Sequence, residues 1–129
     1  MTAFVGTSAL YALLDEDDAN HDRARETFRN LRGRELVTHS NVVVETVALV
    51  SRRLGWAAVE RLINGVLPVI RVIQVDEATH AAALRAFRVA RSVSVSLVDQ
   101  ASFAVMRAEG IDQAFAFDRD FASEGFSQA

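Results

Sequence analysis

Short apolar runs alternate with longer stretches of helical periodicity along the whole chain. The apolar runs are rich in β-branched and aromatic residues, as in Val69 to Val75, which favours strands. The longer stretches repeat their apolar positions every three or four residues, as amphipathic helices do. We therefore expect strands at 2–5, 35–38, 69–75 and 113–117, helices at 7–14, 21–31, 42–55, 56–67, 77–91 and 97–109, and a last short element near Phe126.

Capping and breaking residues stand at the borders of these elements. Hydroxyl and carboxamide or carboxylate side chains are expected to begin the helices; the candidates are Thr7 or Ser8, Asn41, Asp76 and Ser96. Glycine and proline are expected to end them; the candidates are Gly33, Gly55, Pro68 and Gly110.

The alternation predicts an α/β fold, a parallel sheet of about four or five strands with helices on both faces. The length of 129 residues suits one domain, 1–129, and neither a linker nor a repeat interrupts it. In such folds the functional site lies where the strands end at their carboxyl edge. Residues that carry chemistry should therefore follow strands.

Composition removes several classes of function. The chain has no cysteine, which excludes disulfides, thiolate metal sites and cysteine nucleophiles. All 14 basic residues are arginine, so a P-loop NTPase or a Schiff-base enzyme, which needs lysine, is excluded as well. The N-terminus lacks a basic segment typical of signal peptides, and no apolar run reaches the roughly 18 residues that cross a bilayer. We expect a cytoplasmic protein that does not contact the membrane.

Acidic residues in apolar surroundings are the clearest candidates for chemistry. Glu45, Asp99, Asp118 and Asp120 each lie just after a predicted strand or near the start of a helix that follows one. Carboxylates that converge at strand ends repel each other unless a cation lies between them. Mg²⁺ or Mn²⁺ suits such an all-oxygen site.

Each acid also has a structural alternative. Ser96-x-x-Asp99 resembles a capping box, and Glu45 could be a solvated helix residue. Asp118 and Asp120 could form an Asx-type turn at a strand end. The combination is more specific than any of its parts.

The same segments resemble the PIN-domain family, and within it the VapC-type toxins. The opening Phe4-Val5-Gly6-Thr7-Ser8-Ala9-Leu10 is similar to the family's strand that ends in Asp-Thr-Ser-Ala-Leu. Asp18-Ala19-Asn20-His21 resembles its acidic loop, the stretch from Thr38 to Leu49 its second motif, and Leu97-Val98-Asp99 its third. Phe117-Asp118-Arg119-Asp120-Phe121, followed by Gly125-Phe126, resembles its C-terminal signature, so the likeness covers essentially the whole chain.

The resemblance implies a Mg²⁺- or Mn²⁺-dependent endoribonuclease toxin of a type II toxin–antitoxin pair, usually a homodimer. It implies a VapB-type antitoxin as partner, and transfer RNA or ribosomal RNA as substrate. Carried over position by position, Glu45, Asp99, Asp118 and Asp120 are the metal-site carboxylates, and Ser8 is a polar neighbour of the site. A metal held there can activate a water and neutralise charge on a phosphodiester.

The sequence departs from the family at two positions. Gly6 stands where the family has its first acid, and Ala116 where it often has Thr. We favour the hypothesis that Gly6 is an inactivating replacement, because an active ribonuclease toxin harms the host that produces it. Alternatively, Gly6 is natural to a degenerate toxin or to one that binds its metal less tightly, or it simply supplies a sharp turn. In each of the first two cases we expect a chain with weak or no activity.

Several other residues have a functional and a structural interpretation. Arg52 and Arg53 could contact RNA phosphates or belong to a solvated helix face. The histidines could be metal ligands or general bases but are expected on the surface, and Trp56 and the phenylalanines could be base-stacking platforms but are expected in the core. The leucines of the first helix, with Phe28, are expected either in the core or at an interface. A PIN fold that only binds an antitoxin or RNA is the main rival function. A receiver domain is a poor alternative, because it needs a lysine at its acidic site and this chain has none. A HAD-type phosphatase is a poor alternative too, because its Asp-x-Asp motif follows the first strand, whereas Asp118-x-Asp120 follows the last predicted strand.

Overall fold

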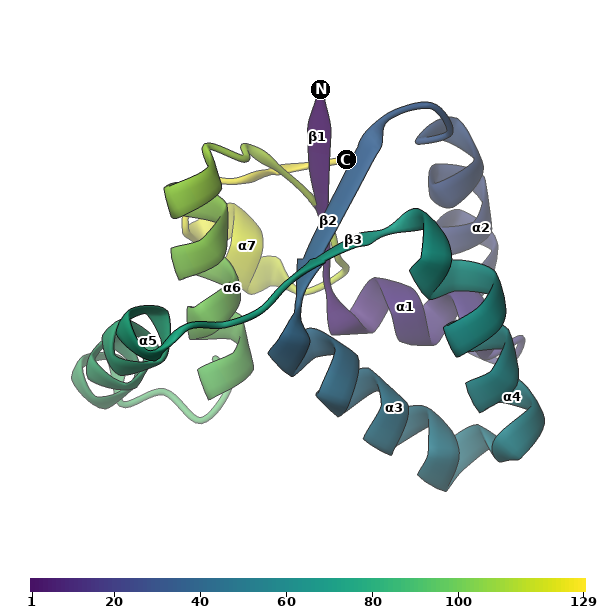
Figure 1. Ribbon diagram of the computed structural model, residues 1–129, viewed down its shortest axis with the longest axis horizontal. Helices are drawn as coiled ribbons and strands as arrows, with labels where there is room; N and C mark the ends of the chain where they lie inside the picture. The colour runs from purple at the N-terminus through teal and green to yellow at the C-terminus, as the bar shows by residue number, and fades with distance from the viewer.

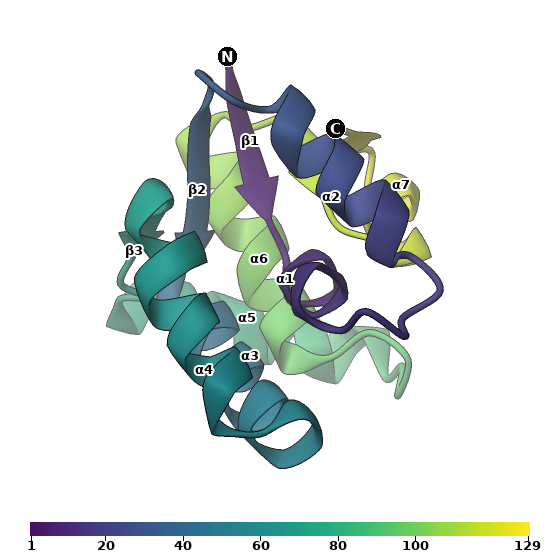
Figure 2. The same ribbon diagram turned by 90° about the vertical axis from the view of Figure 1, so that its right-hand side faces the viewer.

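A computed structural model describes all 129 residues as a five-stranded parallel sheet enclosed by helices. The strand order is β3-β2-β1-β4-β5, and every neighbouring pair is parallel. Helices α2 and α4 lie on one side of the strands, and α5 and α6 on the other (Figures 1 and 2). The predicted α/β fold, with its sheet of four or five strands and helices on both faces, is confirmed.

The elements alternate in the predicted order. They are β1 (Thr2–Val5), α1 (Thr7–Leu14), α2 (His21–Asn30), β2 (Glu35–His39), α3 (Ser40–Leu54), α4 (Trp56–Arg61), η1 (Leu62–Val66), η2 (Leu67–Val69), β3 (Arg71–Ile73), α5 (Glu77–Ala90), α6 (Leu97–Glu109), β4 (Gln113–Phe115), α7 (Arg119–Ser123) and β5 (Ser127–Gln128).

The central strand β1 is buried because both of its edges are paired and helices cover both faces. Ala3, Phe4 and Val5 are fully buried, as a near-continuous apolar run in a parallel sheet should be. Phe4 pairs with Val37 of β2 and with Ala114 of β4. The Thr38 hydroxyl donates a 2.7 Å hydrogen bond to the carbonyl of Val5, which ties the ends of β1 and β2 together.

Helix starts follow the predicted caps in two cases and depart from them in two. The Asp76 carboxylate accepts from the amide of Thr79, and Ser96 and Asp99 form a full capping box. The prediction that Thr7 or Ser8 caps α1 is wrong, because the N-cap is Gly6, and the two hydroxyls bond elsewhere. The prediction for Asn41 is also wrong: the ring of His39 accepts from the amide of Val42 and begins α3.

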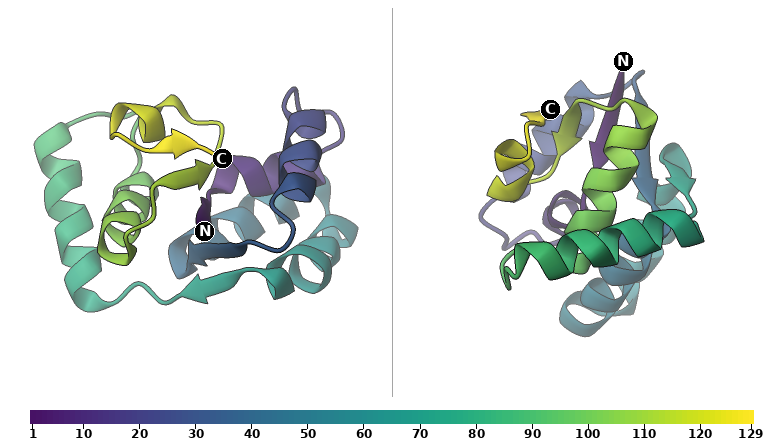
Figure 3. Two further views of the ribbon diagram at one scale, coloured as in Figure 1. Left: turned by 90° about the horizontal axis from the view of Figure 1, so that it is seen from above. Right: turned by 90° about the vertical axis from the view of Figure 1, so that its left-hand side faces the viewer.

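Other boundaries differ from prediction where tertiary packing or proline chemistry decides. The strand expected at 69–75 is only Arg71–Ile73, because Pro68 lies inside the 3₁₀ turn η2 that runs to Val69. The helix expected at 56–67 changes to a π-helical turn after Arg61. β4 ends at Phe115, two residues early, and α7 and β5 form the tail. Figure 3, seen from above, shows this tail beside β4.

The carboxyl ends of β1, β2 and β4 meet at one edge of the sheet, where α1 and α3 begin (Figure 1). The two termini lie at the opposite edge (Figures 1 and 2). This arrangement brings the predicted acidic motifs to the same edge of the molecule.

Candidate active site

Gly6 is buried at the end of β1 and extends its pairing with β4. Its amide donates a 3.0 Å hydrogen bond to the carbonyl of Phe115. Its dihedral angles, φ −95° and ψ 171°, are extended and open to any residue. The hypothesis that glycine is needed here for a sharp turn is therefore wrong.

The two hydroxyls that follow Gly6 hold carboxylates rather than cap the helix. The Thr7 hydroxyl donates to Glu45 Oε1 at 2.6 Å, which joins α1 to α3. The Ser8 hydroxyl accepts from the amide of Phe117 at 2.8 Å and lies 3.4 Å from Asp118 Oδ2, to which it donates. Ser8 therefore lies beside the acids, where the sequence predicted it, and Thr7 plays a part that the sequence analysis missed.

Asp99 has both the structural role and the position expected of a site residue. Its Oδ2 accepts from the amide of Ser96 at 3.0 Å, and its own amide donates to the Ser96 hydroxyl at 3.1 Å. Burial raises the pKa of the Asp99 carboxyl; the bond from the Ser96 amide opposes this, and the charges of Asp118 and Asp120 raise the pKa further. The capping box thus fixes a carboxylate that its acidic neighbours destabilise.

Asp118 lies at the N-cap of α7 but forms no side-chain cap bond there. The Asx-turn alternative for this segment therefore finds no support, since the Asp118 carboxylate accepts from Ser8 instead. Burial raises the pKa of Asp118, the Ser8 hydrogen bond opposes the rise, and the charges of Asp120 and Glu45 add to it. Asp120, in the first turn of α7, acts on both Asp99 and Asp118 through its charge.

Three of the four acids line one hollow of about 320 Å³. Glu45, Asp99 and Asp118 share its wall with residues from α1, the following loop, α3 and the α6 cap: Thr7, Ser8, Tyr11, Asp18, Asn20, Leu49 and Ser96. Tyr11, Asp18 and Asn20 were not predicted as site residues. The acidic loop that the sequence analysis noted for its resemblance carried the signal for Asp18 and Asn20, whereas Tyr11 had none.

The donor chemistry of this hollow fits a hard divalent cation. Its ligating groups are carboxylate, hydroxyl and amide oxygens, and the charges of neighbouring acids add to the rise that burial causes in the pKa of Asp99 and of Asp118. No three acidic or histidine side chains are arranged as a ready-made metal cage. Gly6, which has no ligand atoms, leaves the site one carboxylate short of the pattern it resembles.

The histidine prediction is wrong for one of the three. His80 is exposed and His21 is half-buried, with its Nδ1 2.7 Å from the carbonyl of Ala12. His39 is fully buried, and its Nε2 lies 2.8 Å from the hydroxyl of Ser102. Burial lowers the pKa of His39 to about 4, so the ring is neutral and structural.

Arg52 and Arg53 are exposed in the last turn of α3. The Arg53 guanidinium lies 5.6 Å from the centre of the Tyr11 ring, in a cation–π arrangement at the border of the acidic hollow.

Trp56, expected in the core, is 70% exposed, and that prediction is wrong. The prediction holds for Phe4, Phe103, Phe115 and Phe121, which are buried.

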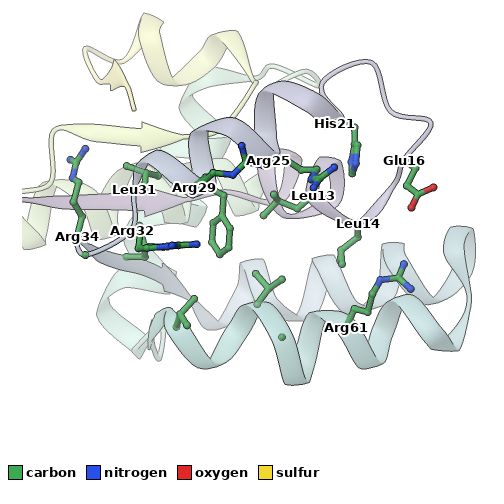
Figure 4. A pocket seen from close by; sticks show the side chains of 16 residues that line it. Leu13, Leu14, Glu16, His21, Arg25, Arg29, Leu31, Arg32, Arg34 and Arg61 are labelled. Carbon is green, nitrogen blue, oxygen red and sulfur yellow. The ribbon is translucent and has the colours of Figure 1, made fainter.

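A second and larger cavity, of about 880 Å³, lies away from the acids between α2 and α4. Leu13, Leu14 and Phe28 contribute to its apolar lining, whereas Leu10 is fully buried in the core. Five arginines also line it: Arg25, Arg29, Arg32, Arg34 and Arg61. Figure 4 shows Arg61 on one side of the cavity and Arg25 and Arg29 on the facing helix. We call this cavity the arginine groove.

None of the helices has the length and apolar character needed to cross a membrane.

The comparisons with known proteins agree with this geometry. The chain is 36% identical over 124 residues to the 23S rRNA-specific endonuclease VapC20 of Mycobacterium tuberculosis, an alignment that covers 95% of this chain and 94% of that protein. The crystal structure of M. tuberculosis VapC20, described as a Sarcin-Ricin loop cleaving toxin, superposes with a TM-score of 0.86 at 34% identity, and covers 100% of this chain and 98% of that one.

More distant structures share the fold. FitAcB from Neisseria gonorrhoeae gives a TM-score of 0.72 at 17% identity, over 99% of this chain and 96% of that one. VapBC2 from Rickettsia felis, solved with a promoter DNA fragment, gives 0.74 at 12% identity, over 100% and 98%. The sequence pattern of the PIN domain matches residues 3–126. With this match over nearly its whole length, the chain belongs to the PIN-domain family.

Proposed function

We propose that this chain is an endoribonuclease toxin of the VapC type, built to use Mg²⁺ or Mn²⁺. The observation that carries the proposal is the convergence of Glu45, Asp99 and Asp118 on one hollow at the carboxyl edge of the sheet. Negative charge crowds there: burial raises the pKa of Asp99 and of Asp118, and the charges of neighbouring acids raise both further. A divalent cation would relieve that crowding.

Each of the three predicted carboxylates that line the hollow has a neighbour that fixes its orientation. Thr7 holds Glu45, the Ser96 amide holds Asp99, and Ser8 holds Asp118. A cation bound by these residues and by Asp120 would supply an activated water and neutralise charge on the scissile phosphodiester. The role of the protein is to hold the carboxylate oxygens in place, so that the side chains of the site need little reorganisation when RNA binds.

We propose ribosomal RNA as the substrate. The support is the relative VapC20, named as specific for 23S rRNA, whose sequence aligns with 95% of this chain. Arg53, which lies over Tyr11 at the border of the hollow, and the neighbouring exposed Arg52 would hold the RNA backbone. Transfer RNA is the alternative that the family resemblance leaves open.

We further propose that the arginine groove receives a segment of a VapB-type antitoxin. Its floor is apolar and its sides carry five arginines against one acid, Glu16. An amphipathic helix with acidic residues along its borders has the complementary pattern. A homodimer in the cytoplasm is the assembly and location we propose, to be tested by the mass of the chain in solution and by fractionation of its host.

Gly6 is proposed to weaken cation binding rather than to change the fold. The backbone at this position is ordinary and the surrounding motif is intact, so what is lost is one negative charge. A second candidate function, a PIN fold that binds antitoxin or RNA without cutting, is favoured by the same loss and by the absence of a ready-made metal cage.

One experiment separates the two candidates. Ribosomal RNA fragments and transfer RNA are incubated with the chain and with Gly6→Asp, each with Mg²⁺ or Mn²⁺ and each with EDTA. Cleavage by Gly6→Asp that EDTA stops supports the nuclease. If neither protein cuts any RNA while the chain still binds an antitoxin peptide, the binding module is the better description.

A further inference from the structure

Trp56, the only tryptophan of the chain, is exposed at the start of α4. Seventy per cent of the side chain is accessible, although tryptophan is usually well buried in soluble domains. Gly55, with φ 87°, forms the tight corner between α3 and α4 that presents the indole. Nothing in the fold requires a large aromatic ring at this corner.

A single face of α3 leads from the acidic hollow toward this corner. Glu45, Leu49 and Arg53 are spaced by four residues and therefore share one side of the helix. Glu45 and Leu49 line the hollow, and Arg53 lies over Tyr11, which lines it too. With a rise of 1.5 Å per residue, Arg53 is about 12 Å along the helix from Glu45. Trp56 follows within the next turn of chain.

The surroundings of Trp56 are polar or small, which argues against a protein surface as its cover. Its exposed neighbours in sequence are Ser51, Arg52, Arg53, Ala57 and Glu60. Trp56 and Ile63, which is 45% exposed and lies seven residues further on, are the large apolar residues that α4 and the turn after it expose, and the exposed Glu60 and Arg61 lie between them in sequence, unlike the broad contiguous patch that marks a protein interface. An exposed aromatic ring that follows exposed arginines such as Arg52 and Arg53 within a few residues of the chain is typical of sites that stack an unpaired base and hold its phosphate.

We propose that Trp56 stacks on an unpaired base of the RNA substrate, while Arg53 and Arg52 hold the adjacent backbone. This inference rests on the proposed function and makes it more specific. It requires the base that meets Trp56 to be unpaired, because a duplex keeps its bases stacked inside and offers none to Trp56. The acidic hollow and Trp56 would then contact the same strand at two points along α3.

Because Trp56 is the only tryptophan, its fluorescence reports directly on this contact. The chain as it stands, with Gly6, is titrated in Mg²⁺ with a hairpin RNA whose loop is unpaired, and with a fully paired duplex of matching length. Binding is followed in parallel by the polarisation of labelled RNA. We expect the hairpin to quench the Trp56 emission strongly and the duplex to leave it nearly unchanged.

Variants at position 56 test how much the stacked ring contributes to RNA affinity. We expect Trp56→Ala to weaken hairpin binding about tenfold and Trp56→Phe to retain most of it. Val89→Ala, a change at an exposed apolar residue of α5, serves as the matched control and should bind as the unaltered chain does. Duplex binding should be equal in all four proteins.

Three results would overturn the inference. Hairpin binding without quenching, or with equal affinity in Trp56→Ala, would mean that no base stacks there while leaving the nuclease proposal intact. A blue-shifted emission that varies with protein concentration in the absence of RNA would mean that a second copy of the chain covers Trp56. RNA cleavage by Gly6→Asp tests the proposed function separately; if no RNA binds or is cut, both proposals fall.

Discussion

Gly6 and Ala116 face each other so closely that a Cβ atom on Gly6 would lie 3.1 Å from the Cβ of Ala116. The next atoms, in Phe121 and the carbonyl of Phe115, are 3.8 and 3.9 Å away. A side chain at position 6 therefore meets one tight contact, with a methyl group, and otherwise ordinary packing. A shift of a few tenths of an ångström at the Ala116 side would admit it.

Replacement of Gly6 by Asp should therefore restore activity at a small cost in stability. We expect metal-dependent RNA cleavage to rise at least about tenfold, because the added carboxylate strengthens cation binding. The free energy of unfolding without metal should fall by about 1 kcal/mol, from crowding and added like charge. Cleavage rates and thermal unfolding measure the two effects.

Gly6→Ala is the matched control for this change. It introduces the same contact with Ala116 but no carboxylate, so it should share only the part of the stability loss that comes from crowding and should gain no activity. Equal cleavage by the Gly6, Ala and Asp proteins would contradict the assignment of position 6 to the metal site.

Neutralising Asp118 should stabilise the protein in the absence of metal. Burial and then the charges of Asp120 and Glu45 raise the pKa of Asp118, so the ionised carboxylate is destabilised by lost hydration and by repulsion. Asp118→Asn removes that charge, and its amide oxygen can still accept from Ser8. We expect a gain below about 1 kcal/mol in EDTA, since the group is partly solvated. We also expect Mn²⁺ to raise the melting temperature of the unaltered chain and not that of Asp118→Asn.

Glu124 offers a contrast, because this acid is paired with Arg107 at 2.7 Å and lies outside the hollow. Glu124→Gln should leave the rise in melting temperature caused by Mn²⁺ unchanged. A Mn²⁺ response that survives Asp118→Asn would contradict the placement of Asp118 among the ligands.

The order of elements and the position of the acids could be predicted because they depend on local patterns. An apolar run such as Ala3 to Val5 and a cap such as Ser96 with Asp99 act through neighbours in sequence. The rule that parallel strands gather their carboxyl ends then placed Glu45, Asp99 and Asp118 together.

What could not be predicted depends on long-range contacts. Thr7 and Ser8 appear as ordinary caps in the sequence, but their partners lie 38 and more than 100 residues away. The burial of His39 against Phe4 and Ser102 depends in the same way on where α6 packs. Trp56 is a residue type expected in the core, but it follows the corner at Gly55 and is exposed there.

RNA and antitoxin should depend on different arginines. A plot of log affinity for single-stranded RNA against log salt has a negative slope. The double variant Arg52→Ala/Arg53→Ala should make this slope shallower by about 1.4, because each phosphate contact contributes roughly 0.7. Arg29→Ala/Arg32→Ala, the same change of charge in the arginine groove, should weaken an acidic antitoxin peptide and leave that slope unchanged. Titrations at several salt concentrations measure both, and an identical loss of RNA affinity in the two double variants would argue against separate surfaces.

His39 should make the protein less stable in acid. Its pKa is lowered from 6.5 to about 4 by burial, so the unfolded chain binds a proton there more readily than the folded chain does. The contribution to stability is complete above pH 6.5 and is lost as the pH falls to about 4, by about 3 kcal/mol in all. Denaturant unfolding across this range should show the loss in the unaltered chain and in His80→Gln, whose histidine is exposed. His39→Gln should be less stable at neutral pH but should lack this part of the acid slope. If its slope matches that of His80→Gln, the buried neutral ring is not what makes the fold acid-sensitive.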